Sequence, residues 1–300
     1  MFDMEPIPTD CGQIVVGVAP QAEPCYMLQW AAEETLRRRT SLRMVHAYEP
    51  VPAHTLTAAP SPFMVEVPYG ARRAANVELS RLVGWLGTRY PMLDVSGLAQ
   101  AGAAVPVLAM QGACAALVVV GRRERGRIAE ALLGSTALDV LDMVGCPVVA
   151  VPDRIGPVPA GAPVVLGVKA RRTSTAAALF ALGAAARAGV PLRVVHCWLP
   201  GEGSDEHTQV PSEVVAGLRD RFPDVPVHLF AVEGGAADLL VRESRSASLL
   251  VLGPGSSGRL PRRLGGVGVG VLRGTACPVA FAPTALARAA RSREGVHNGG

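Results

Sequence analysis

Short apolar runs alternate with amphipathic stretches along most of this chain. The first run, Gln13–Val18 (QIVVGV), is nearly continuous and of strand length, which is the pattern of a strand covered on both faces. Residues 24–39 then show a helical period, with apolar and small side chains recurring on one face: Leu28, Ala31, Ala32, Thr35 and Leu36. The chain therefore begins with a β-α unit.

The same alternation continues to residue 151. It predicts strands at 42–47, 93–99, 117–120 and 147–151, helices at 71–88 and 105–114, and a further helix that opens at Gly134-Ser135-Thr136. Residues 49–68 are rich in proline and lack a period, so they are expected to form a long loop. Strands that alternate with helices predict a parallel sheet with right-handed crossovers and helices on both faces. A ligand crevice is expected where the strand order reverses, between the strands that end at Val18 and Val120.

The second half of the chain repeats the first. Gly17-Val18 and His46 correspond to Gly167-Val168 and His196 at one common offset. Gly121 corresponds to Gly253 and Cys146 to Cys277 at a smaller offset, because only the first half carries the proline-rich insertion. The repeat indicates a duplication. It predicts a domain at 1–153 with an insertion at about 49–69, a linker near 153–162, a second domain at 162–283 and a disordered polar tail at 284–300.

Composition narrows the class of protein. A 49% share of hydrophobic residues in 300 is ample for two cores. No apolar run approaches the roughly 18 residues of a membrane-spanning helix, and the first residues carry acids where a signal peptide needs bases. We therefore expect a cytoplasmic protein without a membrane partner. The net charge of +4 is modest and does not imply binding to nucleic acid.

The six cysteines form no C-x-x-C pair and have no histidine at ligand spacing. They are interpreted as small, buried, reduced side chains, and no metal site is expected. The sequence also lacks a G-x-S-x-G elbow, a G-x-x-x-x-G-K-(S/T) loop and a G-x-G-x-x-G turn after the first strand. It therefore offers no catalytic residue.

The candidate ligand site of the first half follows the strand at 117–120. A glycine and arginine loop leads from Gly121 to a helix whose first turn would contain Gly134, Ser135 and Thr136, and such a turn can present N–H groups to a phosphate. The same residues have structural explanations, because glycines allow tight turns and hydroxyls cap helices. The loop arginines, Arg122 among them, could hold phosphates or remain solvated.

In the second half the corresponding candidates are Gly253, Gly265 and Lys169. Lys169 is the one lysine of the chain and ends a strand at the expected crevice, where it could contact an anion. His46 and His196 each end an apolar strand and are interpreted as structural histidines.

Several segments, in this order and twice over, carry a resemblance to a known family. They are IVVGV and VVLGV, LRMVHAY and LRVVHCW, and the combination VVVG, LLGST and CPVVAVP. The chain resembles a tandem universal stress protein over nearly all of its length. The resemblance implies an α/β fold of two Rossmann-like domains of the adenine nucleotide alpha hydrolase type, each with a five-stranded parallel sheet in the order 3-2-1-4-5. It also implies self-association, either by pairing of the two domains within one chain or as a homodimer.

The resemblance also implies where a nucleotide would bind. ATP-binding members share the motif G-x2-G-x9-G-(S/T), an Asp after the first strand and a hydroxyl two positions past the last motif residue. Gly121, Gly134 and Ser135 match this motif, whereas Glu124 replaces the middle glycine, Ala19 the Asp and Ala137 the distal hydroxyl. A carboxylate at position 124 would repel phosphate.

The second half departs further from the motif. The spacing from Gly253 to Gly265 is one residue short, Gly266 replaces the hydroxyl and Lys169 replaces the Asp. The glycine run that starts at Gly265 also predicts a poor helix start, because each interior glycine costs roughly 1 kcal/mol relative to alanine. No ATP site of the family type is expected there.

Two functions remain open. One is a non-catalytic stress-response or regulatory protein with degenerate nucleotide-binding motifs and an unknown protein partner. The alternative is an ATP-binding module, with slow hydrolysis at most, in which Gly121, Gly134, Ser135 and Thr136 of the first domain still hold the nucleotide. No cofactor is certain in the first reading, and ATP is the cofactor of the second.

Overall fold

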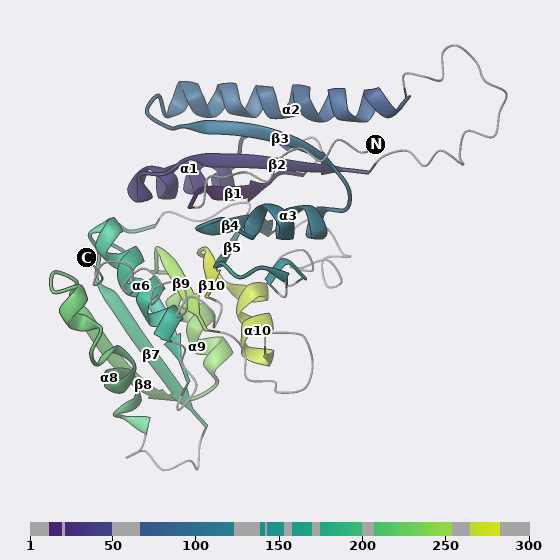
Figure 1. Cartoon of the computed structure of the whole chain (residues 1–300). Coiled ribbons are helices and arrows are strands. Elements are labelled where there is room, and N and C mark those ends of the chain that lie inside the picture. The colour runs from purple at the N-terminus through teal and green to yellow at the C-terminus, as the bar shows by residue number, and fades with distance from the viewer. Residues whose placement is uncertain are drawn as a thin grey trace, which may run out of the picture. The chain divides into compact units, whose positions relative to one another are not determined.

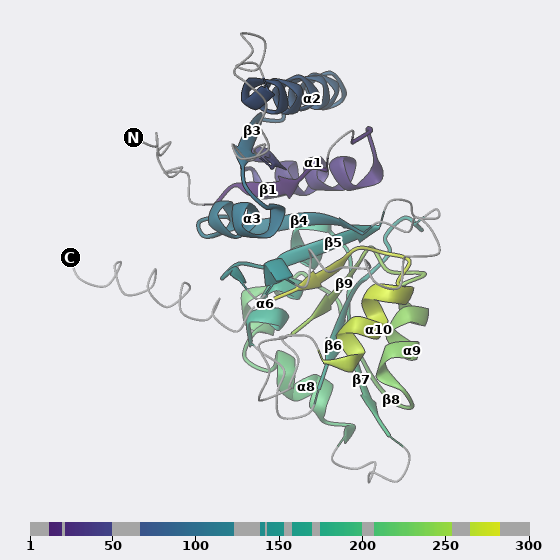
Figure 2. The same cartoon turned by 90° about the vertical axis from the view of Figure 1, so that its right-hand side faces the viewer.

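We describe the fold from a computed structural model of the chain (Figures 1 and 2). The structure describes residues 12–19, 22–49, 67–122, 139–141, 143–152, 158–169, 175–199, 207–253 and 265–282. The chain forms two compact units, Met1–Gly121 and Arg122–Gly300.

The first unit is a parallel sheet with helices on both faces. Its elements are β1 (Ile14–Gly17), α1 (Tyr26–Arg38), β2 (Leu42–Tyr48), α2 (Val67–Arg89), β3 (Val95–Ala101), α3 (Ala104–Gly112) and β4 (Leu117–Arg122, whose last residue belongs to the second unit). The strand order is β3-β2-β1-β4, so the order reverses between β1 and β4, as predicted.

Two glycines show how closely the helices approach this sheet. A Cβ added at Gly17 of β1 would lie 2.9 Å from Leu108 of α3, and one at Gly97 of β3 would lie 3.1 Å from Leu79 of α2. Gly17 is in register with Val45 and Val45 with Leu98, the neighbour of Gly97, so the two glycines point to opposite faces. The predicted three-layer arrangement is therefore confirmed, and Figure 1 shows α2 lying along β3.

The second unit contains the second half of the chain and one strand of the first half. Its elements are β5 (Val148–Pro152), β6 (Val164–Val168), α6 (Thr175–Ala188), β7 (Leu192–Trp198), α8 (Val210–Val215), η3 (Arg219–Arg221), β8 (Val227–Glu233), α9 (Ala236–Glu243), β9 (Leu249–Leu252), α10 (Gly266–Gly274) and β10 (Val279–Phe281). The strand order β10-β9-β6-β7-β8 repeats the predicted order 3-2-1-4-5 when it is read from β8. β5 pairs with the outer edge of β10 in the antiparallel direction.

Some predicted boundaries were wrong. α2 begins at Val67, inside the segment predicted to be a loop, and residues 50–66 of that segment lie outside the described residues. β3 begins at Val95 and not at residue 93, because the chain first turns and Leu93 N–H bonds to the carbonyl of Tyr90 at 2.9 Å. Among the described residues, no helix is long and apolar enough to cross a membrane.

Candidate functional site

The carboxyl edge of the first sheet brings together Ala19 and Gly121, two of the positions singled out in the sequence, and Ala47 of β2. Ala19 lies just past β1, Ala47 is near the end of β2, and Gly121 is near the end of β4, which pairs with β1. None of these three side chains is polar, so they offer a ligand backbone groups and no acid.

Gly121 has a structural explanation. It is exposed, but a Cβ added to it would lie 3.3 Å from the Met27 Sδ atom of α1, which is tighter than ordinary van der Waals contact. Close packing of β4 against α1 therefore favours glycine here without any ligand. The partners predicted for Gly121, namely Gly134, Ser135 and Thr136, lie outside the described residues, as does Glu124.

The second unit places its three candidates at one edge. Lys169 lies just past β6 and Gly253 just past β9, two strands that pair with Gly167 opposite Leu252. Gly265 is the N-cap of α10, which leads into β10, a strand parallel to β9. Because α10 runs back between two parallel strands, its first turn lies at the carboxyl edge with Lys169 and Gly253. Lys169 is exposed there.

The glycine run from Gly265 does form a helix, contrary to the expectation of a poor helix start. α10 spans Gly266–Gly274, and its close approach to α9 explains the composition. A Cβ at Gly270 would lie 3.0 Å from the Ala237 Cβ, and one at Gly274 would lie 3.0 Å from Val241. Packing of the two helices thus offsets the low helix propensity of glycine, and Figure 2 shows them side by side.

Arg122 neither faces solvent nor remains available for a phosphate. It is 4% exposed, and its Nη1 atom donates to the Leu272 carbonyl and to Thr275 Oγ1, both at 2.7 Å. Its Nη2 atom donates to the Thr275 carbonyl at 2.5 Å. These acceptors end α10, where a cation offsets the negative end of the helix dipole. Both interpretations of Arg122 made from the sequence were therefore wrong.

The two equivalent histidines have different surroundings. His46 is 5% exposed, and its buried Nδ1 atom has no hydrogen-bond partner among the described residues. Burial lowers the pKa of His46 below its usual value, and the charge of Glu78 only partly opposes this effect. His196 is 2% exposed and has a partner for each ring nitrogen, the Val168 carbonyl for Nδ1 and His207 Nδ1 for Nε2, both at 3.1 Å.

Sequence reasoning missed His207 and Trp198 as neighbours of His196. The rings of Trp198 and His207 are parallel within 2°, with centroids 5.5 Å apart. Trp198 could have been found, because it follows His196 by two positions on the same strand and so shares its face. His207 gives no such signal, because it lies outside the strand.

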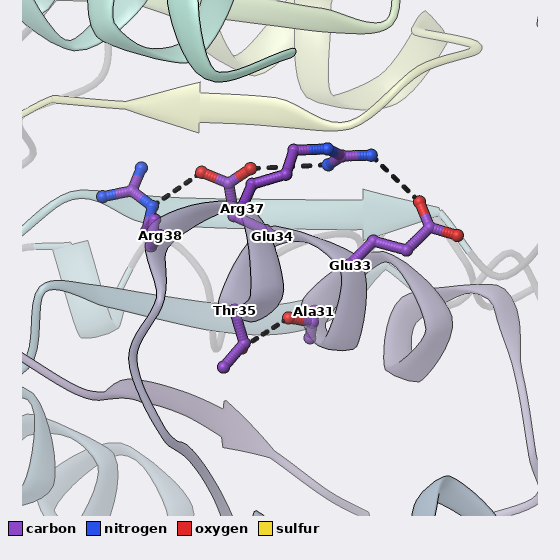
Figure 3. A network of polar contacts seen from close by, with 6 residues as sticks. All are labelled: Ala31, Glu33, Glu34, Thr35, Arg37 and Arg38. Atoms are coloured by element: carbon purple, nitrogen blue, oxygen red, sulfur yellow. Dashed lines mark hydrogen bonds and ion pairs between the residues drawn. The ribbon is translucent and has the colours of Figure 1, made fainter. Parts of the chain in front are cut away.

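A polar network on α1 lies away from this edge (Figure 3). The buried Glu34 accepts a hydrogen bond from Arg38 Nε at 2.6 Å and pairs with Arg37 at 3.5 Å, while Arg37 also reaches Glu33 at 3.1 Å. These residues occupy the end of α1, which runs back from the carboxyl edge to the amino edge of the sheet. The network therefore stabilises the helix and takes no part in the candidate site.

Cys197 and Cys277 carry no reactive signature. Burial raises the pKa of Cys197 to about 11 and that of Cys277 to about 12, so both thiols stay protonated. Cys114 is exposed, which corrects the prediction that the cysteines are buried, and Cys11 lies outside the described residues. Within the described ranges, no three His, Cys, Asp or Glu side chains gather to hold a metal ion.

Comparison with known proteins identifies the family. The model of the universal stress protein family matches residues 12–152 and again 162–283. The chain belongs to the universal stress protein family. Universal stress protein Rv2005c of Mycobacterium tuberculosis is 31% identical over 289 residues, which cover 90% of this chain and 96% of that protein.

Solved structures support the same fold. A universal stress protein from Archaeoglobus fulgidus superposes with a TM-score of 0.65 at 16% identity and covers 91% of this chain and 96% of its own. A universal stress protein from Pseudomonas aeruginosa gives a TM-score of 0.62 at 16% identity over 95% and 97% of the two chains. The tandem arrangement of two universal stress protein domains, which the sequence predicted, is thus shown, and so is the α/β fold.

Proposed function

We propose that this universal stress protein is a non-catalytic stress-response or regulatory protein whose nucleotide-binding motifs are degenerate. One observation carries the proposal. ATP-binding members have an Asp directly after the first strand of the domain, and neither domain of this chain has a carboxylate at that position. Ala19 follows β1, and the exposed Lys169 follows β6. A methyl group cannot accept a hydrogen bond from a base or a ribose. An ammonium group cannot accept one either, because it has only donors.

The surroundings of the other candidates support the same reading. Gly121 packs against Met27, and Arg122 is held by the end of α10, so both have roles that need no ligand. Within this proposal the protein acts in the cytoplasm through a protein partner and self-associates, and the domains are those of the repeat, 1–153 and 162–283.

Isothermal titration of the purified full chain with ATP and Mg²⁺, ADP and cyclic AMP tests the proposal. Denaturation of a parallel sample shows whether nucleotide has been carried through purification. We expect neither heat of binding nor carried nucleotide. Micromolar binding at about one site per chain would overturn the proposal in favour of ATP binding by the first domain, and Ser135→Ala would then be expected to weaken that binding.

A gain-of-function variant tests the reason for the degeneracy. Glu124 stands where the motif has glycine, and the loop otherwise keeps its length. We expect Glu124→Gly to raise ATP affinity measurably, because it removes both a side chain and a negative charge from the phosphate site. Val77→Gly on the exposed face of α2 is the matched control. If Glu124→Gly changes nothing, the missing acid at position 19 becomes the main obstacle, which Ala19→Asp would address.

A further inference from the structure

β8, the outermost strand of the second unit, has backbone groups that no other strand uses. It pairs with β7 on one side and ends the strand order. Leu192 N–H donates to the Pro226 carbonyl at 2.8 Å, just before β8. Gly234 N–H donates to the Trp198 carbonyl at 2.8 Å, just after it. The even-numbered residues of β8 therefore bond to β7, and the N–H and C=O groups of its odd-numbered residues point outward. Within the described ranges, nothing pairs with these outward groups.

Large apolar side chains are exposed on both faces of this strand. Leu229 is 40% exposed and Phe230 is 37% exposed, and as neighbours on a strand they point to opposite faces. The Arg193 guanidinium of β7 lies 4.6 Å from the centroid of the Phe230 ring and pairs with Glu243 at 2.5 Å. The seven residues of β8 include no lysine or proline, which natural edge strands use to prevent pairing with other chains. The edge is therefore suited to receive a further strand.

The corresponding edge of the first unit is different. β3 is also an outermost strand, but its sequence VSGLAQA has serine, glycine and glutamine where β8, VHLFAVE, has histidine, leucine and valine. The helix that follows the second strand of the first repeat, α2, is 23 residues long and lies along β3 (Figure 1). The helix at the same place in the second unit, α8, has six residues. Of the two edges, β8 is the one that exposes large apolar side chains.

We propose that β8 pairs with β8 of a second copy of this chain, in the antiparallel direction across a two-fold axis between the two Phe230 residues. The proposal rests on the self-association proposed above and gives it a location. In this register all seven residues of the strand have a partner. Leu229 faces the partner's Ala231. Glu233, the one acid of the strand, faces the partner's Val227, so no like charges meet. Because the residues of both pairs are odd-numbered, their outward N–H and C=O groups form the bonds of an antiparallel ladder.

The pair at the axis is Phe230 with the partner's Phe230. Its backbone groups bond to β7, so the pair is of the non-hydrogen-bonded kind, in which the Cα atoms lie about 4.5 Å apart and the side chains are closest. Two aromatic rings at this spacing attract each other, while each ring keeps its own Arg193. Glu243 balances the charge of each Arg193, so the two guanidinium groups do not oppose the pairing.

The symmetry of this contact fixes the size of the assembly. Both copies contribute the same strand, so the interface closes once two chains have met. The proposal therefore predicts a dimer through β8 and no longer chain of copies through this edge.

Analytical ultracentrifugation of the full chain over a wide range of concentrations tests the interface. We expect a reversible dimer whose share rises with concentration. Ala231→Pro removes an outward N–H group that only the proposed ladder uses, so it should raise the dimer dissociation constant at least about tenfold. Ala99→Pro is the matched control, because Ala99 of β3 stands opposite His46 as Ala231 stands opposite His196, and its N–H also points outward. It should leave the dissociation constant within about twofold of wild type.

A second pair of variants guards against an effect of proline on the fold. Leu229→Lys puts a charge at an exposed position of β8 and should also raise the dissociation constant at least about tenfold, because two ammonium groups would then enter the interface. Val77→Lys makes the same kind of change at an exposed position of α2 and should have no effect. A dimer that survives both Ala231→Pro and Leu229→Lys would overturn this interface and leave self-association standing. A wild-type chain that stays monomeric at every concentration would overturn both the interface and self-association between chains.

Disulfide trapping tests the register. Phe230→Cys should form a disulfide between two chains under mild oxidation, because a Cα separation of about 4.5 Å at the axis lies within the disulfide range. Leu229→Cys should not, because the two copies of that residue are two positions out of register and more than about 7 Å apart. Mass spectrometry of the linked peptides separates these disulfides from any made by the native cysteines. Linkage through Leu229→Cys but not through Phe230→Cys would overturn the proposed pairing.

Discussion

The two halves of the chain repeat one fold with different chemistry inside it. α1 carries a buried acid with two arginines around it, whereas α6 at the same place is largely alanine, TAAALFALGAAARA. His46 leaves a nitrogen unpaired among the described residues, whereas His196 satisfies both nitrogens. Duplication has preserved the apolar pattern that builds the sheet and has let the polar positions diverge. Equivalent positions should therefore respond unequally to the same substitution.

The largest effect is expected at Arg122, a residue of the first repeat with no equivalent in the second, where Pro254 stands. Arg122→Met should destabilise the second unit by about 3 kcal/mol, because it leaves buried acceptors at the end of α10 without donors. Urea unfolding, with hydrogen exchange to locate the loss, measures this effect. Arg81→Met removes an exposed arginine of α2 and should change stability far less, because solvent screens its ion pairs. Equal costs would contradict the role assigned to Arg122.

The histidine pair gives the sharpest comparison between the repeats. His196→Leu should cost about 2 kcal/mol, because the Val168 carbonyl and His207 both lose their partner. His46→Leu should stay within about 0.5 kcal/mol of wild type, because it replaces a buried nitrogen that has no partner among the described residues. The same unfolding assay compares the two, and a larger loss from His46→Leu would reverse our assignment.

A smaller and opposite pair of effects is expected where α1 and α6 end. Arg39 follows α1 with φ 53°, a left-handed conformation in which the second repeat has Gly189 with φ 64°. Arg39→Gly should therefore stabilise the chain by about 1 kcal/mol, and Gly189→Arg should destabilise it by about the same amount. Thermal unfolding is sufficient to detect both, and shifts of the same sign would contradict the explanation.

The smallest effect concerns pH and the first unit. Burial lowers the pKa of His46, so the unfolded chain binds this proton more readily than the folded one. Its contribution to stability is present above the ordinary histidine pKa of about 6.5 and is lost as the pH falls through the lowered pKa. Stability profiles from pH 8 to pH 5 should therefore be flatter for His46→Leu than for wild type, with Tyr48→Leu as a neighbouring control on β2. Parallel profiles for wild type and His46→Leu would refute this.

Much of the fold could be predicted because apolar periodicity fixes which strands are buried. QIVVGV and LRMVHA became β1 and β2 within one residue at each end. The start of α2 was missed because Val67 and Pro68 follow a stretch without a period, although proline fits the first turn of a helix. The stability of α10 was underestimated because helix propensity is a local property. Its glycines are explained by close packing against α9, a helix some thirty residues earlier.

The candidate site could be predicted less well, because it depends on contacts that a sequence does not display. Gly121 and Lys169 lie where the pattern placed them, at strand ends. The partners of Arg122 are about 150 positions away along the chain, and no sequence motif near Arg122 or near its partners indicates the contact. The pairing of His196 with His207 likewise arises only when the chain folds back.

Because β5 pairs with β10 in the antiparallel direction, the boundary between the sequence repeats differs from the boundary between the folded units. The first sequence repeat ends near the linker, yet its last strand, β5, is part of the second compact unit. A second repeat expressed alone from the linker onward would expose the unpaired edge of β10, which could then pair with a strand of another molecule. The two repeats are therefore distinct in sequence, but neither proteolysis nor truncation at the linker would separate them into two intact folded units.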